Sequence, residues 1–231
     1  MRRTKIICTM GPATDNEDVL RDLMLNGMDV ARLNFSHGSH EEALERINRI
    51  KKVRDELNIP VAILLDTKGP EVRIKDFKEG KVELKEGQKF TLCTDDVVGD
   101  ENQVSITYAN LPNDVKVGSK ILIDDGLIEM EVISVKNSKI LCKVKNGGVV
   151  SNKKGVNVPN VALSMPYMSQ KDIDDILFGI EQDVDFIAAS FVRTANDIRE
   201  IKTLLRDNGG RDIRIIAKIE NAEGVDNIDD I

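Results

Sequence analysis

A lysine and a glutamate at the end of an apolar strand are the residues of this sequence best suited to chemistry. Lys218 and Glu220 close the stretch 213–221, whose β-branched run after a Gly-Gly break predicts a buried strand. Residues two apart on a strand point to the same side, so the ammonium and the carboxylate project together. A buried ion pair barely offsets its own desolvation, and stability alone therefore rarely explains such a pair. The pattern predicts a binding or catalytic role.

Two other predicted strands also end in polar side chains. Arg32, Asn34 and Ser36 alternate at the end of one strand, and Asp66 and Thr67 directly follow another. Arginine binds phosphate or carboxylate through a rigid fork, lysine stabilises a developing negative charge, and a glutamate oxygen suits Mg²⁺. The remaining oxygens suit a second cation, whose valence the pattern leaves open. Ordinary solvation explains any single strand end equally well, but three complementary ends favour a site for anionic substrates.

Further cations flank the middle of the chain. Arg73 and the pair Lys153-Lys154 are placed to reach phosphates, although exposed lysines beside a glycine are common. The sequence contains neither GxxxxGK[ST] nor GxGxxG, so phosphate-loop and dinucleotide-fold explanations lack their motif.

Composition limits the class of protein. The 231 residues are 41% hydrophobic and 32% charged, which is ordinary for a globular protein, and the net charge of -7 argues against a general nucleic-acid binder. No apolar run approaches membrane-spanning length, and no signal peptide is evident. The three cysteines show no CxxC pair and the only histidines are His37 and His40, so we expect reduced thiols, no zinc site and a cytoplasmic location.

The apolar periodicity predicts strands and helices in alternation. Helices are expected to begin at Asp15, at Ser39 with Glu42 in a capping box, at Ser169 and at Thr194. The strands are expected at residues 5–9, 29–35, 61–65, 185–191 and from 213 onward.

This alternation predicts an α/β fold with a parallel sheet. Five β/α units indicate a partial (β/α)₈ barrel, about five of eight units, and an open doubly wound sheet is the alternative. Between the third and fourth strands the helical pattern stops and turn signals such as Asp125-Gly126 appear. We therefore predict a barrel part at 1–69, an inserted small all-β domain at 70–163, and a second barrel part at 164–231.

The strand-end motifs resemble those of the pyruvate kinase family over essentially the whole chain. The matching stretches are Thr4-Lys-Ile-Ile-Cys-Thr-Met-Gly-Pro-Ala-Thr, Ala31-Arg-Leu-Asn-Phe-Ser-His-Gly, Leu65-Asp-Thr-Lys-Gly-Pro-Glu-Val-Arg, Lys153-Lys-Gly-Val-Asn-Val-Pro and Ile216-Ala-Lys-Ile-Glu-Asn-Ala-Glu-Gly. The resemblance implies transfer of a phosphoryl group from phosphoenolpyruvate to ADP, with Mg²⁺ (or Mn²⁺) and K⁺, in a barrel whose inserted β domain closes as a lid.

The resemblance also implies a role for each matching residue. Lys218 would stabilise the phosphoryl group in transit, Arg32 would bind the substrate phosphate, and Glu220 would hold Mg²⁺. The implied K⁺ ligands are Asn34, Ser36, Asp66 and Thr67. The implied contacts to the nucleotide phosphates are Asn34, Phe35, Ser36, His37, Arg73 and Lys154.

The family pattern continues beyond these 231 residues, with a second metal-binding aspartate, a later threonine and a C-terminal domain. The resemblance therefore implies that this chain by itself has little or no kinase activity, and that a full-length parent is a homotetramer. Two alternatives remain: a non-catalytic fragment that at most binds ligand, and a barrel lyase or aldolase acting on phosphoenolpyruvate or pyruvate. The inserted domain counts against the lyase or aldolase.

Overall fold

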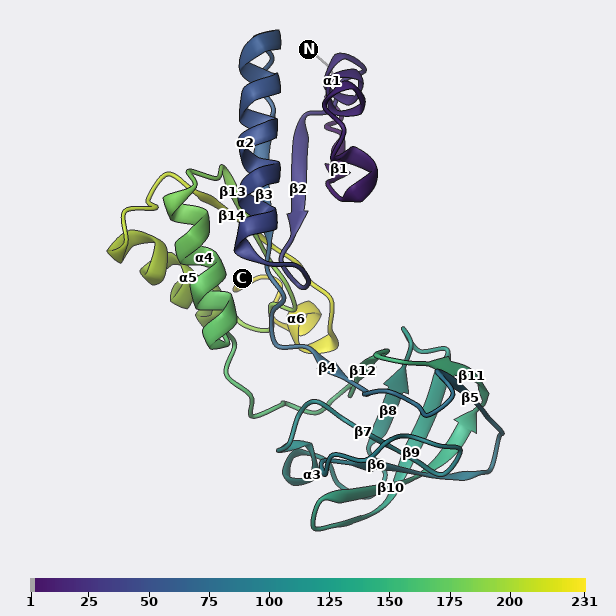
Figure 1. The fold of residues 1–231 in the computed structure, drawn as a ribbon. Helices are drawn as coiled ribbons and strands as arrows, with labels where there is room; N and C mark the ends of the chain where they lie inside the picture. Colours follow the sequence, from purple (N-terminus) through teal and green to yellow (C-terminus); the bar gives the residue numbers. More distant parts are fainter. Residues whose placement is uncertain (1–2) are drawn as a thin grey trace. The chain divides into compact units, whose positions relative to one another are not determined.

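The structure, a computed structural model, describes residues 3–231. These residues form two compact units, both labelled in Figure 1. The first, here called the sheet unit, contains the described residues up to Pro70, Tyr167–Glu220 and Asn227–Ile231. The second, here called the inserted unit, contains Glu71–Pro166 and Asn221–Asp226.

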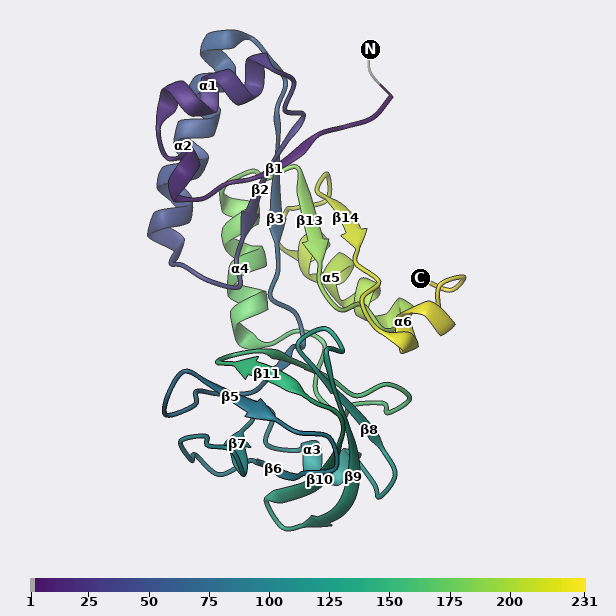
Figure 2. The same cartoon turned by 90° about the vertical axis from the view of Figure 1, so that its right-hand side faces the viewer.

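The sheet unit is built on five parallel strands that follow one another in chain order (Figure 2). They are β1 (Ile7–Thr9), β2 (Val30–Asn34), β3 (Ala62–Asp66), β13 (Phe186–Ala189) and β14 (Arg214–Ala217). A doubly wound sheet reverses its strand order at a switch point, and this sheet has no reversal. The order confirms the partial (β/α)₈ barrel and rules out the doubly wound alternative.

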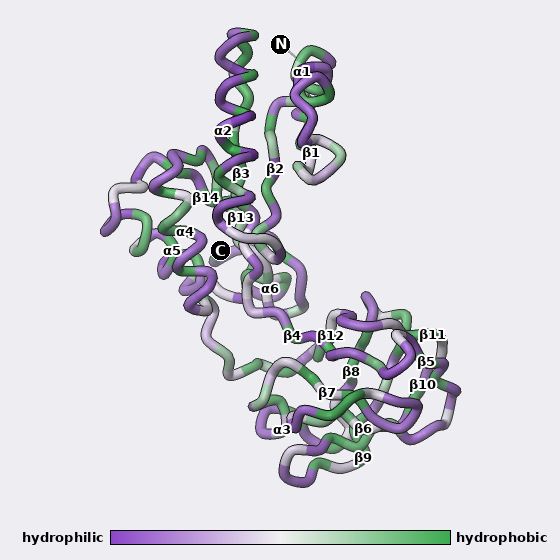
Figure 3. The backbone as a smooth tube through the Cα atoms, in the orientation of Figure 1, coloured by the Kyte–Doolittle hydropathy of each residue, from purple (hydrophilic) through white to green (hydrophobic). Residues whose placement is uncertain are grey.

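Helices cover the connections between these strands. They are η1 (Pro12–Thr14), α1 (Glu17–Leu25), α2 (His40–Leu57), α4 (Gln170–Glu181) and α5 (Ala195–Asp207). Ser169 and Thr194 precede α4 and α5 as predicted. Ser169 forms a reciprocal capping box with Asp172, whereas the amide and the hydroxyl of Thr194 both donate to Asp197. Ser39 caps α2 by accepting a hydrogen bond from the Glu42 amide. α2 alternates between polar and apolar residues along its turns (Figure 3), as expected of a helix with one buried face.

The predicted cap of the first helix was wrong by one residue. Asn16, not Asp15, accepts the hydrogen bond from the Asp18 amide at 2.7 Å. The carboxylate of Asp15 instead accepts from Arg46 and Arg49 of α2. Adjacent Asp and Asn residues are equally good caps by type, and the two arginines decide which of them is free for the task.

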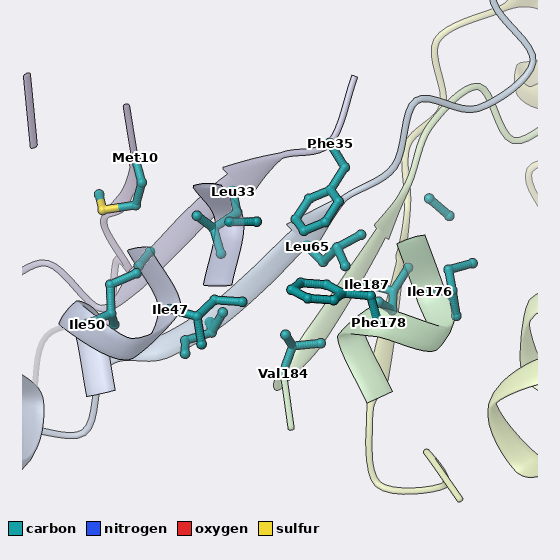
Figure 4. Close-up of a cluster of buried hydrophobic side chains, with 14 of the residues drawn as sticks. Met10, Leu33, Phe35, Ile47, Ile50, Leu65, Ile176, Phe178, Val184 and Ile187 are labelled. Atoms are coloured by element: carbon teal, nitrogen blue, oxygen red, sulfur yellow. The ribbon is translucent and has the colours of Figure 1, made fainter. Parts of the chain in front are cut away.

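The hydrophobic core of the sheet unit lies between the sheet and its helices. Figure 4 shows side chains from β2, β3 and β13 meeting those of α2 and α4. The strand residues that belong to this cluster or pack against it alternate along each strand: Ala31 and Leu33, Ile63 and Leu65, Ile187 and Ala189, Ile215 and Ala217. Successive strand residues point to opposite faces. Arg32, between Ala31 and Leu33, and Asp66, directly after Leu65, therefore face the side of the sheet away from the helices.

The expectation that β14 is a buried strand was wrong. None of its four residues is fully buried, and Ile216 is 40% exposed. β14 pairs only with β13 and is an edge strand within the described residues, so one side of its backbone and one face stay open. The β-branched pattern correctly indicated a strand but not its position at the edge of the sheet.

The inserted unit is a β structure with its own core. Its main sheet runs β4 (Val72–Arg73), β12 (Gly155–Asn157), β8 (Lys120–Ile123), β9 (Ile128–Lys136), β10 (Lys139–Asn146), β6 (Lys89–Cys93) and β7 (Gln103–Ser105). The smaller elements are the strand pair β5 (Lys81–Leu84) and β11 (Gly148–Ser151) and the helices α3 (Leu111–Asp114) and α6 (Ala222–Asp226). β8 and β9 pair antiparallel around Asp125-Gly126, which confirms the predicted hairpin.

A partly exposed polar cluster makes the stability of the inserted unit depend on pH. Asp114 accepts hydrogen bonds from the Tyr108 hydroxyl and from the amide and hydroxyl of Ser164. Burial raises the pKa of Asp114, but these hydrogen bonds outweigh it and the net pKa lies below the ordinary value. A lowered pKa stabilises the fold above the unfolded-state value, and this contribution is lost as pH falls through the folded-state value.

We therefore expect Asp114→Asn to cost about 1 kcal/mol of unfolding free energy near neutral pH. The difference in unfolding free energy between variant and wild type should narrow as pH falls below about 4, because Asp114 becomes protonated and both side chains are then neutral. Urea titrations at several pH values, followed by a probe in the inserted unit, would measure this difference. A gap that stays constant with pH would contradict the prediction.

The three cysteines should differ sharply in reactivity. Cys93 and Cys142 are buried, and burial raises the pKa of the Cys142 thiol to about 12. Cys8 on β1 is only half-buried. Because the thiolate is the reactive form, iodoacetamide at about pH 8 should modify Cys8 first and Cys142 only after unfolding. Peptide mass mapping against time would show the order, and early labelling of Cys142 would contradict it.

Candidate functional site

The candidate site lies on the sheet face away from the helices, where the polar residues at the strand ends meet. Asp66 at the end of β3 is its centre, with 3% of its surface exposed. Arg32 Nε donates to Asp66 Oδ2 at 2.6 Å, and Lys218 Nζ donates to Asp66 Oδ1 at 3.1 Å. β2, β3 and the segment after β14 thus bring together three of the predicted residues.

Ser190 completes this cluster, and the sequence analysis missed it. It directly follows β13, is 2% exposed, and its Oγ accepts from Lys218 Nζ at 2.8 Å. The same hydroxyl lies 3.1 Å from Asp66 Oδ1 and 2.6 Å from the Thr67 carbonyl oxygen. The signal was present, because Ser190 follows an apolar strand just as Asp66 does. The strands β2, β3, β13 and β14 of the sheet unit therefore each contribute a residue at or near the carboxyl end.

The packing behind Ser190 fixes its backbone. The Tyr167 hydroxyl donates to the Ser190 carbonyl at 3.0 Å, and burial raises the pKa of this tyrosine, which keeps it a donor. Gly69 lies against the same carbonyl, where a Cβ would come within 2.6 Å of the oxygen, and its φ is +68°. Only glycine satisfies both conditions without strain. The Gly69 amide in turn donates to the buried carboxylate of Asp172.

Glu220 lies beside this cluster and keeps its carboxylate exposed. Glu220 Oε1 is 3.4 Å from Lys218 Nζ, and Oε2 accepts the Phe191 amide at 3.0 Å. Phe191 has a φ of 54°, a conformation that costs a non-glycine residue energy and that recurs at functional sites. The predicted pairing of Lys218 with Glu220 is therefore present in the structure.

The turn after β2 carries the remaining predicted residues of the sheet unit. Asn34 Oδ1 accepts the Ser36 amide at 3.0 Å, and Asn34 lies opposite Asp66 in the β2–β3 register. Ser36 is half-buried and His37 is exposed. Phe35 points the other way, is 5% exposed and packs in the core.

The donor chemistry fits the expected cations. Asn34, Ser36, Asp66 and Thr67 place hard oxygens at the adjoining ends of β2 and β3, although both Asp66 oxygens already accept hydrogen bonds from Arg32, Lys218 and Ser190. Glu220 offers one accessible carboxylate, and Mg²⁺ commonly binds one or two carboxylates with substrate oxygens completing its shell. Within the described residues no group of three or more His, Cys, Asp or Glu side chains could hold a metal ion by itself.

The two predicted cations of the inserted unit lie on neighbouring strands. Arg73 on β4 is the register partner of Gly155 on β12, directly after Lys154. Lys154 Nζ pairs with Asp124 at 2.9 Å, and Arg73 pairs with Glu71 at 2.5 Å. Both cations keep about a third of their side chain exposed, at 36% each, so each could exchange its carboxylate for an anionic ligand.

Comparison with known proteins identifies the family. A family model described as the barrel domain of pyruvate kinase matches residues 1–231. The chain belongs to the pyruvate kinase family. It is 54% identical over 232 residues to the pyruvate kinase of Geobacillus stearothermophilus, covering 100% of this chain and 40% of that relative. The pyruvate kinase of Clostridium perfringens is 49% identical over 232 residues, covering 100% of this chain and 49% of the relative.

The chain thus spans less than half the length of these pyruvate kinases. None of the helices among residues 3–231 is both long enough and apolar enough to cross a membrane.

Ser190 offers a test of the cluster in this member of the pyruvate kinase family. Ser190→Ala removes an acceptor from Lys218 and a donor from the Thr67 carbonyl, both in a buried setting. We expect a loss of about 1–3 kcal/mol in unfolding free energy, measured by urea titration. Thr203→Ala, at an exposed position of α5, is the control and should not destabilise the chain. Equal stability of Ser190→Ala and wild type would contradict the prediction.

Proposed function

We propose that this chain supplies the phosphate-handling part of a pyruvate kinase, which transfers a phosphoryl group from phosphoenolpyruvate to ADP. The observation that supports this most directly is the position of Lys218. Its ammonium lies within 3.4 Å of Asp66, Ser190 and Glu220 oxygens, yet its side chain stays 28% exposed. It is held in place and remains accessible to a ligand.

In the proposed reaction the bond between phosphorus and the enol oxygen breaks, and a bond from phosphorus to a terminal oxygen of ADP forms. The released enolate takes up a proton to give pyruvate. The moving phosphoryl group offers little covalent chemistry to a protein, so catalysis consists of positioning and neutralising charge. Arg32 would orient the phosphate through the guanidinium hydrogens that Asp66 and Thr9 do not engage, and Lys218 would stabilise the charge in transit.

The charges of the site leave room for cations. Arg32 and Lys218 are balanced by Asp66 and Glu220, so the four side chains are neutral together. Mg²⁺ or Mn²⁺ would be held by Glu220 and would supply positive charge to the phosphate oxygens. K⁺ would be held by Asn34, Ser36, Asp66 and Thr67, and the nucleotide phosphates by the Asn34–His37 turn with Arg73 and Lys154.

We further propose that the 231-residue chain by itself binds these ligands with little or no turnover. Of the two carboxylates in the site, Asp66 is already occupied by Arg32 and Lys218, which leaves Glu220 as the accessible one. A single carboxylate holds Mg²⁺ weakly unless substrate oxygens and further protein ligands complete its shell. A lyase or aldolase reaction has less support, because neither reaction would need the inserted unit that this chain contains.

Two measurements on the purified chain test these proposals. Calorimetric titration in Mg²⁺ and K⁺ should show binding of both phosphoenolpyruvate and ADP, and the binding of phosphoenolpyruvate should disappear in Arg32→Met. A coupled assay for ATP formation should show at most trace activity. Rapid K⁺-dependent ATP formation would overturn the proposal of low turnover, and absence of binding for both ligands would overturn the proposed site.

A further inference from the structure

A buried carboxylate on α4 binds the first residue of α2, and the proposed function does not use this contact. His40 Nε2 lies 2.7 Å from Asp175 Oδ1, and Asp175 is 1% exposed. The second oxygen of Asp175 accepts Lys171 Nζ, also at 2.7 Å. A buried carboxylate is costly unless both oxygens are paired. One partner lies on each carboxylate oxygen, and the two partners come from different helices and are themselves partly exposed to solvent.

The ring of His40 is held by stacking, in addition to the hydrogen bond at Nε2. It stacks on Phe178 with centroids 4.5 Å apart and an interplanar angle of 19°. The centroid of the Phe35 ring lies 5.9 Å from that of Phe178 and 6.1 Å from that of His40, and Figure 4 shows the two phenylalanine rings side by side, tilted relative to each other. The three rings join the end of β2, the start of α2 and the middle of α4.

This arrangement fixes both ends of the turn that follows β2. At one end, the Phe35 amide donates to the Asp66 carbonyl at 2.9 Å, and the Phe35 ring packs on Phe178. At the other end, Asp175 binds His40. Between the two ends, Ser36 is held by its amide contact with Asn34. If a turn is ordered before its ligand arrives, binding does not have to pay the conformational entropy of ordering it.

We propose that His40 and Asp175 are positioning residues that hold the turn 36–39 in the conformation that receives ADP phosphate and K⁺. This inference rests on the proposed function of that turn. A positioning role differs from a general role in packing α2 against α4. Loss of a packing contact destabilises the whole sheet unit, whereas loss of a positioning contact loosens only the turn.

Three variants separate the two roles. His40→Phe keeps an aromatic ring for the stack and removes the hydrogen-bond donor. His40→Gln can restore a donor to Asp175 without the ring. Lys171→Met removes the other partner of the same carboxylate, contacts no residue of the turn in the structure, and is the matched control.

Hydrogen exchange on the 231-residue chain gives a readout that needs no activity. Losing one hydrogen bond should speed exchange of the amides at 36–39 about tenfold in His40→Phe. The same amides should be unchanged in Lys171→Met and partly restored in His40→Gln. In all three variants the amide of Ile187 in β13 should exchange as slowly as in wild type.

Calorimetric titration with ADP, in Mg²⁺ and K⁺, gives the second readout. We expect the Kd for ADP to rise about tenfold in His40→Phe and to stay within about threefold of wild type in Lys171→Met. Equal effects of His40→Phe and Lys171→Met, or faster exchange throughout the sheet unit, would show a packing role and overturn the proposal. Faster exchange at 36–39 in His40→Phe with an unchanged Kd for ADP would also overturn the proposal. If wild type itself fails to bind ADP, the proposed function of the turn fails and the inference fails with it. The exchange pattern would still show whether His40 orders the turn.

Discussion

Replacing Lys218 by methionine is expected to lower kcat about 10²–10³-fold in a full-length pyruvate kinase that contains this chain. Methionine has a similar length but no charge, so the phosphoryl group loses the cation that stabilises it in transit. Asp66 keeps Arg32 and Ser190 as partners, and the fold should therefore remain intact. Steady-state kinetics with phosphoenolpyruvate and ADP would measure the effect.

The control for this variant is Lys202→Met, which removes an exposed lysine from α5. It should leave kcat unchanged. Lys218→Arg restores the charge but not the compact ammonium, and we expect it to recover only part of the lost rate. A Lys218→Met enzyme that retains more than about a tenth of wild-type kcat would refute the assigned role.

Asp66→Asn is expected to have the largest effect on stability. The substitution removes the charge that Arg32 and Lys218 share at the end of β3, and breaking a buried ion pair in this way typically costs about 3–5 kcal/mol. Both cations retain partial solvent access, so we expect a value of about 3 kcal/mol. Urea unfolding followed by a probe in the sheet unit would measure it.

Asp212→Asn is the matched control, because Asp212 belongs to the sheet unit and is exposed in a turn. Its unfolding free energy should lie within about 0.5 kcal/mol of wild type. A cost below about 1 kcal/mol for Asp66→Asn would mean that solvent already screens the two cations and that Asp66 is not the centre of the cluster.

Comparing Lys218→Met with Asp66→Asn separates a catalytic role from a structural one. Lys218→Met should lose rate with little loss of stability, whereas Asp66→Asn should lose both. If Lys218→Met unfolds as readily as Asp66→Asn, the lysine has a structural role that its partly exposed side chain does not suggest.

Local patterns predicted the elements of the sheet unit well. The alternation of β-branched strands with capped helices is a short-range signal, and it located β2, β3, Ser169 and Thr194 correctly. Position within the sheet is a long-range property. The pattern of β14 indicated burial, but burial depends on which strands lie beside it, and β14 is an edge strand.

The same distinction applies to the site. Arg32, Asp66 and Lys218 could be predicted because each places a charge within or directly after a largely apolar strand. Ser190 follows an equally clear strand, but a serine after a strand is ordinary, and only its contacts with Lys218 and Thr67 reveal its place. His40 could not be predicted at all, because its partner Asp175 is on a different helix of the chain.

The agreement between strand order and chain order bears on how the protein is assembled during synthesis. When the ribosome releases β2 and then β3, the neighbouring strand of each is already present. The pairing of β3 with β13 must wait for the inserted unit, although loop closure costs only about 0.6 kcal/mol more for each doubling of length. β14 emerges after the other four strands. Lys218 therefore meets Asp66 only once the rest of the sheet is in place, and no partly made sheet can present the complete cluster.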